Sequence, residues 1–431
     1  MNLVLDIFKE ITAIPRCSGT HNEFINYVKN YALKYDYECF VDEVNNILCK
    51  KKNSKSKICL QSHYDIVCLI DNTIPKIIED NGFFKAENST LGADNGIGCS
   101  YMLALMAENK DLEYLFTSDE EIGLIGANDI NLEIKSPFML NIDSEEEGEI
   151  CIGCAGGVDI ISKHSTHELI ANEEKLKLYE ITISKLRGGH SGVNIHENIP
   201  NALKLIAKSI KECEGKLLDL NGGERINSIP ANAKAIIASK TPPKVTHENM
   251  SIVEVKDIPE HLNIYSDEIV DFIYNFKNGV IEFNDELNVV ETSINLAIVK
   301  TQLNEIVIKL SARSMDNDKL NNIKKQTKEM LEKYNFIVET KGKYPAWKPD
   351  KNEFTQTVYE IYKKHNPNAE FRAIHAGLEC AIFKEKFPHL KVASIGPNIY
   401  NPHSYDEKVS ISSINNLYHI VKEIVSSKEA I

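Results

Sequence analysis

The sequence lacks the features of several classes of protein. No apolar run approaches the ~18 residues that a membrane-spanning helix needs. The first turns carry Asp6, Lys9 and Glu10, so we expect no signal-peptide core there. Basic residues are in deficit, with 49 Lys and Arg against 63 Asp and Glu and a net charge of -14. This balance argues against nucleic acid or an anionic membrane as a partner.

The cysteines and glycines also exclude some chemistry. The ten cysteines have no disulfide-like spacing, and we expect free thiols in a reducing cytoplasm. Cys151-x-x-Cys154 has the spacing of a redox or zinc pair, but the absence of a second pair favours a structural role. The glycine-rich run at 90–98 does not end in Gly-Lys-Ser or Gly-Lys-Thr, so it is not a phosphate loop.

The rest of the composition is that of a globular protein with more than one domain. The 431 residues suffice for two or three cores, and the apolar fraction of 42% and charged fraction of 26% are ordinary. Apolar periodicity predicts helices at 22–35 and 97–108 and strands at 57–62, 112–117 and 137–142. This alternation predicts an α/β fold with a mostly parallel sheet covered on both faces.

The middle of the chain has a different pattern. It predicts strands at 178–184 and 305–312 and helices at 201–213 and 316–334, the latter with Asp316 as its N-cap. We interpret it as an α+β lid domain inserted in the first domain, whose pattern resumes after Tyr344 with a strand at 391–395. The predicted division is a catalytic domain at 1–156 and 344–431 and a lid domain at 157–343.

The most informative stretch is the predicted strand at 112–117 and the two acids that follow it, Glu120 and Glu121. Neighbouring residues of an extended chain point to opposite sides, so one carboxylate can bind a metal while the other faces a water. An isolated acidic pair is more often a solvated turn, so the prediction depends on the other polar residues near predicted strand ends.

Four other candidate ligands are present, and two of them stand in comparable places. His63 and Asp143 each follow a predicted strand, and functional residues gather at the carboxyl ends of parallel strands. Asp94 stands in the glycine-rich turn that opens a helix, and His403 lies in a loop. In addition, Asp65 could hydrogen-bond the imidazole of His63 and fix its tautomer.

These residues suit metal-assisted hydrolysis. Two histidines and three carboxylates can hold two zinc or similar divalent ions, with one carboxylate bridging. Paired metals can share a water, lower its pKa and stabilise the developing oxyanion. Glu120 would then act as the general base that passes the proton of that water to the leaving amine.

Several motifs resemble those of the M20 family of di-zinc metallopeptidases, and most of all its aminoacyl-histidine (Xaa-His) dipeptidase branch. They cover nearly the whole chain in order: Leu60-Gln-Ser-His-Tyr-Asp65, Leu91-Gly-Ala-Asp-Asn-Gly96, Ser118-Asp-Glu-Glu-Ile-Gly-Leu-Ile-Gly126, Leu186-Arg-Gly-Gly-His-Ser-Gly192, Arg225-Ile-Asn-Ser-Ile-Pro230, His375-Ala-Gly-Leu-Glu-Cys380 and Ser394-Ile-Gly-Pro-Asn398. The resemblance implies a zinc-exopeptidase-like catalytic domain with a lid, and hydrolysis of dipeptides of Xaa-His or broad specificity. Cobalt or manganese could replace zinc.

The resemblance also implies individual roles. Asp94 would bridge the two metals, one held further by His63 and Asp143, the other by Glu121 and His403. Asp65 would orient His63, and Glu120 would be the base. From the lid, His190 would stabilise the tetrahedral intermediate, Arg313 would bind the substrate carboxylate, and Asn227 would reach the substrate. A homodimer formed through the lid is one assembly open to such a chain.

Two departures and several alternatives stand beside this interpretation. Tyr405 and Ser62 replace the proline and glycine usual in the family, which puts the side-chain preference in question. A tripeptidase or an amino-acid deacylase could use the same scaffold, and a non-catalytic peptide-binding relative would have a damaged site. A serine hydrolase using Ser191 is disfavoured because Gly189-His-Ser-Gly-Val193 lacks the second glycine of Gly-x-Ser-x-Gly.

Overall fold

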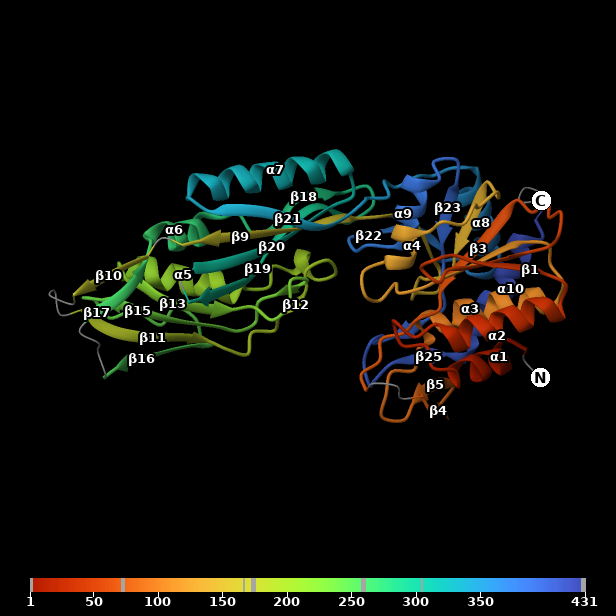
Figure 1. The fold of residues 1–431 in the computed structure, drawn as a ribbon, viewed down its shortest axis with the longest axis horizontal. Coiled ribbons are helices and arrows are strands. Elements are labelled where there is room, and N and C mark those ends of the chain that lie inside the picture. Colours follow the sequence, from red (N-terminus) through yellow and green to blue (C-terminus); the bar gives the residue numbers. More distant parts are fainter. Residues whose placement is uncertain are drawn as a thin grey trace. The chain divides into compact units, whose positions relative to one another are not determined.

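The computed structural model describes residues 3–70, 74–165, 167–171, 176–256, 261–303 and 305–427. The chain forms two compact units. Unit 1 comprises Met1–Gly153, Pro349–Ala373 and Leu378–Ile431, and unit 2 comprises Cys154–Lys348 and Ile374–Gly377. The chain therefore leaves unit 1 for a long middle segment and again for a short later one (Figure 1).

Unit 1 is built on an eight-stranded sheet. Its strands run in the order β1 (Glu38–Val41), β2 (Ile47–Lys50), β6 (Glu113–Thr117), β3 (Ile58–His63), β7 (Phe138–Asn141), β23 (Lys391–Ser394), β8 (Glu149–Cys154) and β22 (Glu370–Ile374). The central strands β6, β3, β7 and β23 are parallel, whereas β1, β2 and β8 pair antiparallel outside them. Every residue of β3 and β6 is buried, as expected for strands covered on both faces.

The helices of unit 1 pack around this sheet, and most of them share one apolar core. They are α1 (Leu3–Thr12), α2 (Asn22–Lys34), α3 (Ala93–Ala107), α4 (Ile125–Asp129), α8 (Glu353–His365), α9 (Glu379–Lys386) and α10 (Ile411–Val425). A smaller sheet joins β24 (Ile399–Tyr400), β25 (Lys408–Ser410), β5 (Phe83–Ala86) and β4 (Ile77–Asp80). In α3 nearly all side chains are buried, so this helix lies inside the core rather than over it.

Unit 2 contains an antiparallel sheet with its own core. The strand order is β16 (Met250–Val255), β11 (Lys177–Ile183), β15 (Ala233–Ser239), β13 (Lys216–Gly222), β19 (Val289–Gln302), β20 (Glu305–Ser314), β9 (Gly156–His164) and β21 (Ile337–Tyr344), and β18 (Gly279–Asn284) also pairs with β19. Its helices are α5 (Ala202–Glu212), α6 (Asp267–Asn275) and α7 (Asn317–Lys333), with the short helix η1 (Ile195–Glu197). Figure 1 shows α7 along β9 and β21.

Two further strand pairs complete unit 2: β10 (His167–Ala171) with β17 (His261–Tyr265), and β12 (Gly189–His190) with β14 (Ser228–Ile229). The mixed α/β class and the inserted α+β segment are as predicted. The helices α2, α5 and α7 and the strands β3, β6, β7, β11, β20 and β23 lie at the predicted places, and Asp316 is the N-cap of α7.

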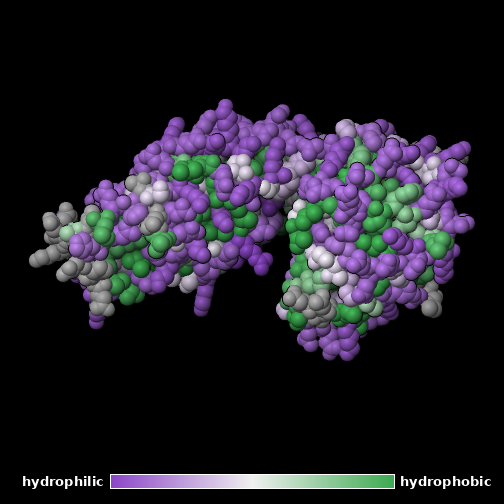
Figure 2. Space-filling model, in the orientation of Figure 1, coloured by the Kyte–Doolittle hydropathy of each residue, from purple (hydrophilic) through white to green (hydrophobic). Residues whose placement is uncertain are grey.

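The surface drawn in Figure 2 is mostly hydrophilic in both units, with smaller apolar patches between the hydrophilic residues. Among the described residues, no helix is long and apolar enough to cross a membrane.

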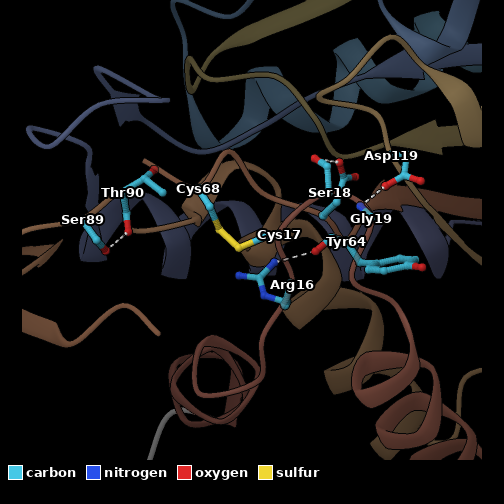
Figure 3. The surroundings of a disulfide bond; sticks show 10 residues. Arg16, Cys17, Ser18, Gly19, Tyr64, Cys68, Ser89, Thr90 and Asp119 are labelled. Atoms are coloured by element: carbon cyan, nitrogen blue, oxygen red, sulfur yellow. Dashed lines mark hydrogen bonds between the residues drawn. A yellow bond between two sulfur atoms is a disulfide. The ribbon is translucent and has the colours of Figure 1, made fainter. Parts of the chain in front are cut away.

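One expectation about the cysteines was wrong. Cys17 and Cys68 form a disulfide, with a sequence separation of 51 (Figure 3). The bond is possible because the backbone of Cys17 pairs with that of Ile66. Spacing along the chain carried no sign of this pairing, since it depends on the path of the loop after β3.

Candidate metal centre

The predicted ligands of unit 1 meet at the carboxyl ends of its parallel strands. His63 is the last residue of β3, and Glu120 and Glu121 follow β6, whose Thr117 is paired with His63. Asp143 follows β7, which is the other parallel neighbour of β3. The parallel register brings these three loops to one edge of the sheet, as the sequence predicted.

Asp94 lies between two histidines. Its Oδ1 is 3.1 Å from His63 Nε2, and its Oδ2 is 3.0 Å from His403 Nε2. His63 Nε2 also lies 3.2 Å from Asp143 Oδ1, and His403 Nε2 lies 3.0 Å from Glu121 Oε2. The donors therefore form two groups that share one carboxylate.

The donor set fits divalent cations. His63, Asp94 and Glu121 each offer a ligand atom within 4.8 Å of the others. Glu121 Oε1 is buried and has no hydrogen-bond partner among the described residues. Imidazole nitrogens and carboxylate oxygens at this spacing are ligands that zinc and similar ions accept.

The carboxylates of the site are crowded. Burial raises the pKa of Glu121 to about 7, and burial together with Glu121 and Asp143 raises the pKa of Glu120 well above its usual value. Burial lowers the pKa of His403, but hydrogen bonds to Asp94 and Glu121 outweigh it and raise the pKa. Without bound cations, burial and the repulsion between neighbouring carboxylates disfavour their ionised forms.

Asp65 connects His63 with the acidic pair. The Nδ1 atom of His63 lies 3.0 Å from the backbone oxygen of Asp65 and 3.5 Å from its Oδ1. The Asp65 carboxylate also accepts hydrogen bonds from the backbone nitrogens of Glu120, at 3.0 Å, and Glu121, at 3.2 Å. Asp65 therefore orients the imidazole, with its backbone oxygen as the nearer contact, and its carboxylate holds the backbone of the acidic turn.

Glu407 holds the turn before α3, and the sequence reasoning missed it. Its Oε2 accepts from the backbone nitrogens of Leu91 and Gly92, and its Oε1 from those of Ala93, at 2.8 Å, and Asp94, at 3.4 Å. Helix N-termini leave such groups without partners, and a carboxylate satisfies them. The motif from His403 to Glu407 thus supplies both a candidate ligand and the support of Asp94.

A second missed residue, Glu379, lies in a buried polar layer at the strands that carry the site. Its Oε2 accepts from Gln61 Nε2 at 2.6 Å and from Thr117 Oγ1 at 2.7 Å. Burial raises the pKa of Glu379 to about 8. Gln61 and Thr117 belong to β3 and β6, so this carboxyl ties together the strands that end at His63 and before Glu120.

The three candidates from the lid lie in unit 2. The His190 Nδ1 accepts from the backbone nitrogens of Gly192 and Val193, and burial, with the nearby Arg313, lowers its pKa to about 4. The side chain of Arg313, on β20, donates to Tyr344 Oη at 2.9 Å. Asn227 is exposed, and its backbone oxygen accepts from the backbone nitrogen of Ser191.

His375 also belongs to this cluster in unit 2. Its Nε2 lies 2.7 Å from Ser293 Oγ, and Ser293 is paired with Arg313 across β19 and β20. Burial and Arg313 lower the pKa of His375 to about 3, which keeps the ring neutral. His375 stands in a motif that the sequence singled out, but nothing in the sequence gave it a partner.

Comparisons with known proteins identify the family of this chain. The model of peptidase family M20/M25/M40 matches residues 59–427, so the chain belongs to this family, and the predicted family is confirmed. The protein is a metallopeptidase.

Its relatives include a cytosol non-specific dipeptidase of Escherichia coli (strain K12), which is 32% identical over 472 residues, with 97% of this chain and 96% of the relative covered. The crystal structure of aminoacylhistidine dipeptidase from Vibrio alginolyticus matches with a TM-score of 0.83 and 28% identity, over 98% of this chain and 96% of that one. A tripeptidase from Staphylococcus aureus shares the fold, with a TM-score of 0.61 and 18% identity over 99% and 98%.

Proposed function

We propose that this chain is a metal-dependent dipeptidase of Xaa-His or broad specificity. The observation that carries the proposal is the Asp94 carboxylate between His63 and His403, with Asp143 and Glu121 beside them. The relatives named above support dipeptides as the substrate, since two of them bear the name dipeptidase.

In the proposed site, the Asp94 carboxylate would be shared by two divalent ions. His63 and Asp143 would hold one of them, and Glu121 and His403 would hold the other, which follows the grouping of the side-chain distances given above. We propose zinc because imidazole and carboxylate ligands suit it, with cobalt or manganese as substitutes. Such a pair, when bound, lowers the pKa of water and stabilises negative charge on the substrate oxygen.

Glu120 is the proposed general base. It follows β6 next to Glu121, and its backbone nitrogen is fixed by Asp65 at 3.0 Å. In this role Glu120 takes a proton from the attacking water and gives it to the amine nitrogen as the peptide bond breaks. Asp65 keeps the His63 ring in place throughout, because it contacts Nδ1 and leaves Nε2 free to bind.

The lid residues have proposed roles in substrate binding. A neutral His190 can donate a hydrogen bond to the oxyanion of the tetrahedral intermediate through its Nε2, because Nδ1 already accepts from Gly192 and Val193. Arg313 can bind the terminal carboxylate of a dipeptide with its planar guanidinium, and Asn227 can contact the substrate.

The location of the protein and its oligomeric state are proposals as well. We propose the cytoplasm as the location, supported by the cytosolic name of the relative. A homodimer through the lid can be tested by measuring the molar mass in solution.

A substrate panel tests the proposed activity. Purified protein is assayed with dipeptides that include Xaa-His, with tripeptides and with N-acyl amino acids, before and after treatment with a chelator. We expect hydrolysis of dipeptides that is lost with chelator and restored by added zinc. Faster hydrolysis of tripeptides or N-acyl amino acids would reassign the substrate, and full activity in metal-free protein would overturn the mechanism.

A further inference from the structure

A buried arginine connects two of the loops that carry the proposed metal ligands. Arg16 is 1% exposed and lies between α1 and α2. Its Nη1 donates to the backbone oxygen of Tyr64, at 2.9 Å, and its Nη2 donates to that of Gly92, at 3.1 Å (Figure 3 shows the first of these bonds). Tyr64 follows the ligand His63, and Gly92 stands two residues before the ligand Asp94.

The glycine-rich turn provides the space that the guanidinium occupies. A Cβ atom at Gly92 would lie 3.1 Å from Arg16 Nη2, and one at Gly96 would lie 2.7 Å from it. Gly92 also has a φ of +69°, which suits glycine. At Gly92 the side chain of Ile66 lies closer still, at 2.8 Å, so the approach of Arg16 explains Gly96 above all, while the φ of Gly92 and Ile66 also call for glycine there.

Opposite charges hold this turn. Arg16 binds its carbonyl at Gly92, and Glu407 binds its amide nitrogens from Leu91 to Asp94. Burial lowers the pKa of Arg16, while Cys99, Glu407, Asp65 and Asp94 raise it, and a guanidinium stays charged in proteins. The Nε atom of Arg16 is buried and has no hydrogen-bond partner among the described residues.

The buried Arg16 is by itself a poor source of folding stability. A buried charge with an unsatisfied N–H group costs free energy that an apolar side chain of similar size would not. What an apolar side chain cannot supply is a planar, charged fork that fixes two carbonyl groups at a set separation. The two carbonyls belong to the loops of His63 and Asp94, whose side chains meet at 3.1 Å.

The residues after Arg16 support the same loops. Ser18 Oγ donates to Asp65 Oδ2 at 2.8 Å, and the backbone nitrogen of Gly19 donates to Asp119 Oδ1 at 2.7 Å. Asp119 directly precedes Glu120. The segment from Arg16 to Gly19 thus contacts the loops after β3 and β6 and, through Arg16, the turn before α3.

We propose that Arg16 is a positioning residue of the metal centre, which fixes the separation between the His63 loop and the Asp94 turn. This inference rests on the proposed function, because it takes His63 and Asp94 to be ligands. Replacement of the guanidinium should loosen the donor set and weaken metal binding before any substrate is present.

Cobalt binding to metal-free protein tests the proposal. Co²⁺ is titrated into the wild type and Arg16→Lys by calorimetry, and the visible absorption of the bound ion reports the ligand geometry. Lysine keeps the charge but loses the fork, so we expect affinity for Co²⁺ to fall by roughly 10–100-fold, with an altered spectrum. Gly96→Ala is the second variant, because it displaces the guanidinium while keeping Arg16 and is expected to act in the same direction.

Phe8→Leu is the matched control. Its ring also approaches Gly96, at 3.0 Å from a Cβ built there, but it has no hydrogen bond with either loop. We expect Phe8→Leu to lower thermal stability and to leave Co²⁺ affinity and spectrum unchanged.

The outcomes separate the two proposals. If the wild type binds no Co²⁺, the proposed function fails. If the wild type binds Co²⁺ and Arg16→Lys and Gly96→Ala bind it equally well with the same spectrum, the role of Arg16 is refuted. If Arg16→Lys does not fold, Gly96→Ala decides, and a loss of affinity in Phe8→Leu equal to that in Gly96→Ala would also refute it.

Discussion

Asp94 Oδ2 lies 3.0 Å from His403 Nε2, although the two residues are 309 positions apart in sequence. The same carboxylate reaches His63 with its other oxygen. A single aspartate thus contacts both histidines of the donor set. Metal binding and activity should therefore depend on Asp94 more than on any proposed ligand that belongs to one of the two groups.

Asp94→Asn should remove both metals. The amide keeps the shape of the side chain but loses the negative charge that would bridge two cations, so we expect less than one ion per chain and a loss of roughly 10³-fold in kcat/KM. Metal content measured by mass spectrometry checks this. Asp80→Asn, at a surface ion pair with Lys85, should bind metal normally. Two bound ions in Asp94→Asn would exclude the bridging role.

Glu120→Gln should separate metal binding from catalysis. The glutamine cannot accept a proton, but the proposed ligands are unchanged, so kcat should fall by roughly 10²–10⁴-fold while metal content stays at the wild-type value. The measurement is steady-state kinetics on a dipeptide, with metal analysis of the same sample. Near-normal turnover would show that another group is the base.

The stability of unit 2 should fall in acid. Burial and Arg313 lower the pKa of His190 to about 4 and that of His375 to about 3, below the ordinary histidine value near 6.5. The unfolded chain therefore binds more protons than the folded one below pH 6.5, and stability is lost as the pH falls through that value towards 4. Allowing for solvent screening, we expect the pair to cost about 2 kcal/mol between pH 7 and pH 5.

Trp347 makes this measurable, because it is the single tryptophan of the chain and lies buried in unit 2. Urea unfolding followed by its fluorescence at both pH values should give a smaller difference for His190→Asn. The exposed His261→Gln, also in unit 2, should leave the difference unchanged. An equal pH dependence in wild type and His190→Asn would contradict the assignment.

Reduction of the Cys17–Cys68 disulfide should destabilise unit 1. The bond closes a loop with a sequence separation of 51, and loss of such a link typically costs about 2–4 kcal/mol. Chemical unfolding with and without a dithiol, together with mass spectrometry of alkylated thiols, measures this. The Cys17→Ser/Cys68→Ser double variant should be less stable and insensitive to the dithiol. If the native protein alkylates at Cys17 without reductant, the bond is absent.

Local sequence patterns were enough to predict the regular elements and the polar residues at the strand ends. The buried run of β3 and the N-cap at Asp316 depend on neighbours within a few residues, and both could be predicted from the chain alone. The residues expected to form the metal centre could be grouped because parallel strands bring their carboxyl ends together. The predicted start of α3 at 97 is later than the observed start at Ala93, but Asp94 and Asn95 have non-helical torsion angles, so the regular part of the helix begins after Asn95, close to the prediction.

The supporting residues could not be predicted in this way. Arg16 contacts Gly92 across 76 positions, and Glu407 contacts Leu91 across 316, so neither contact leaves a periodic signal. Arginine and glutamate are mostly exposed in proteins, so an isolated arginine after a helix or a glutamate in a polar loop is expected at the surface. Only the folded chain shows that both are buried around the turn of Asp94.

Because Arg16 approaches Gly96 closely, the residue accepted at one of these positions depends on the residue at the other when the sequence changes in evolution. With Arg16 present, a Cβ at position 96 would lie 2.7 Å from the guanidinium, so alanine there must displace the end of the arginine side chain. Conversely, a shorter residue at position 16 would remove the donor to the carbonyls of Tyr64 and Gly92 and leave a space that alanine at 96 could partly fill. Among variants selected for folding alone, alanine at position 96 should therefore appear together with a replacement of Arg16.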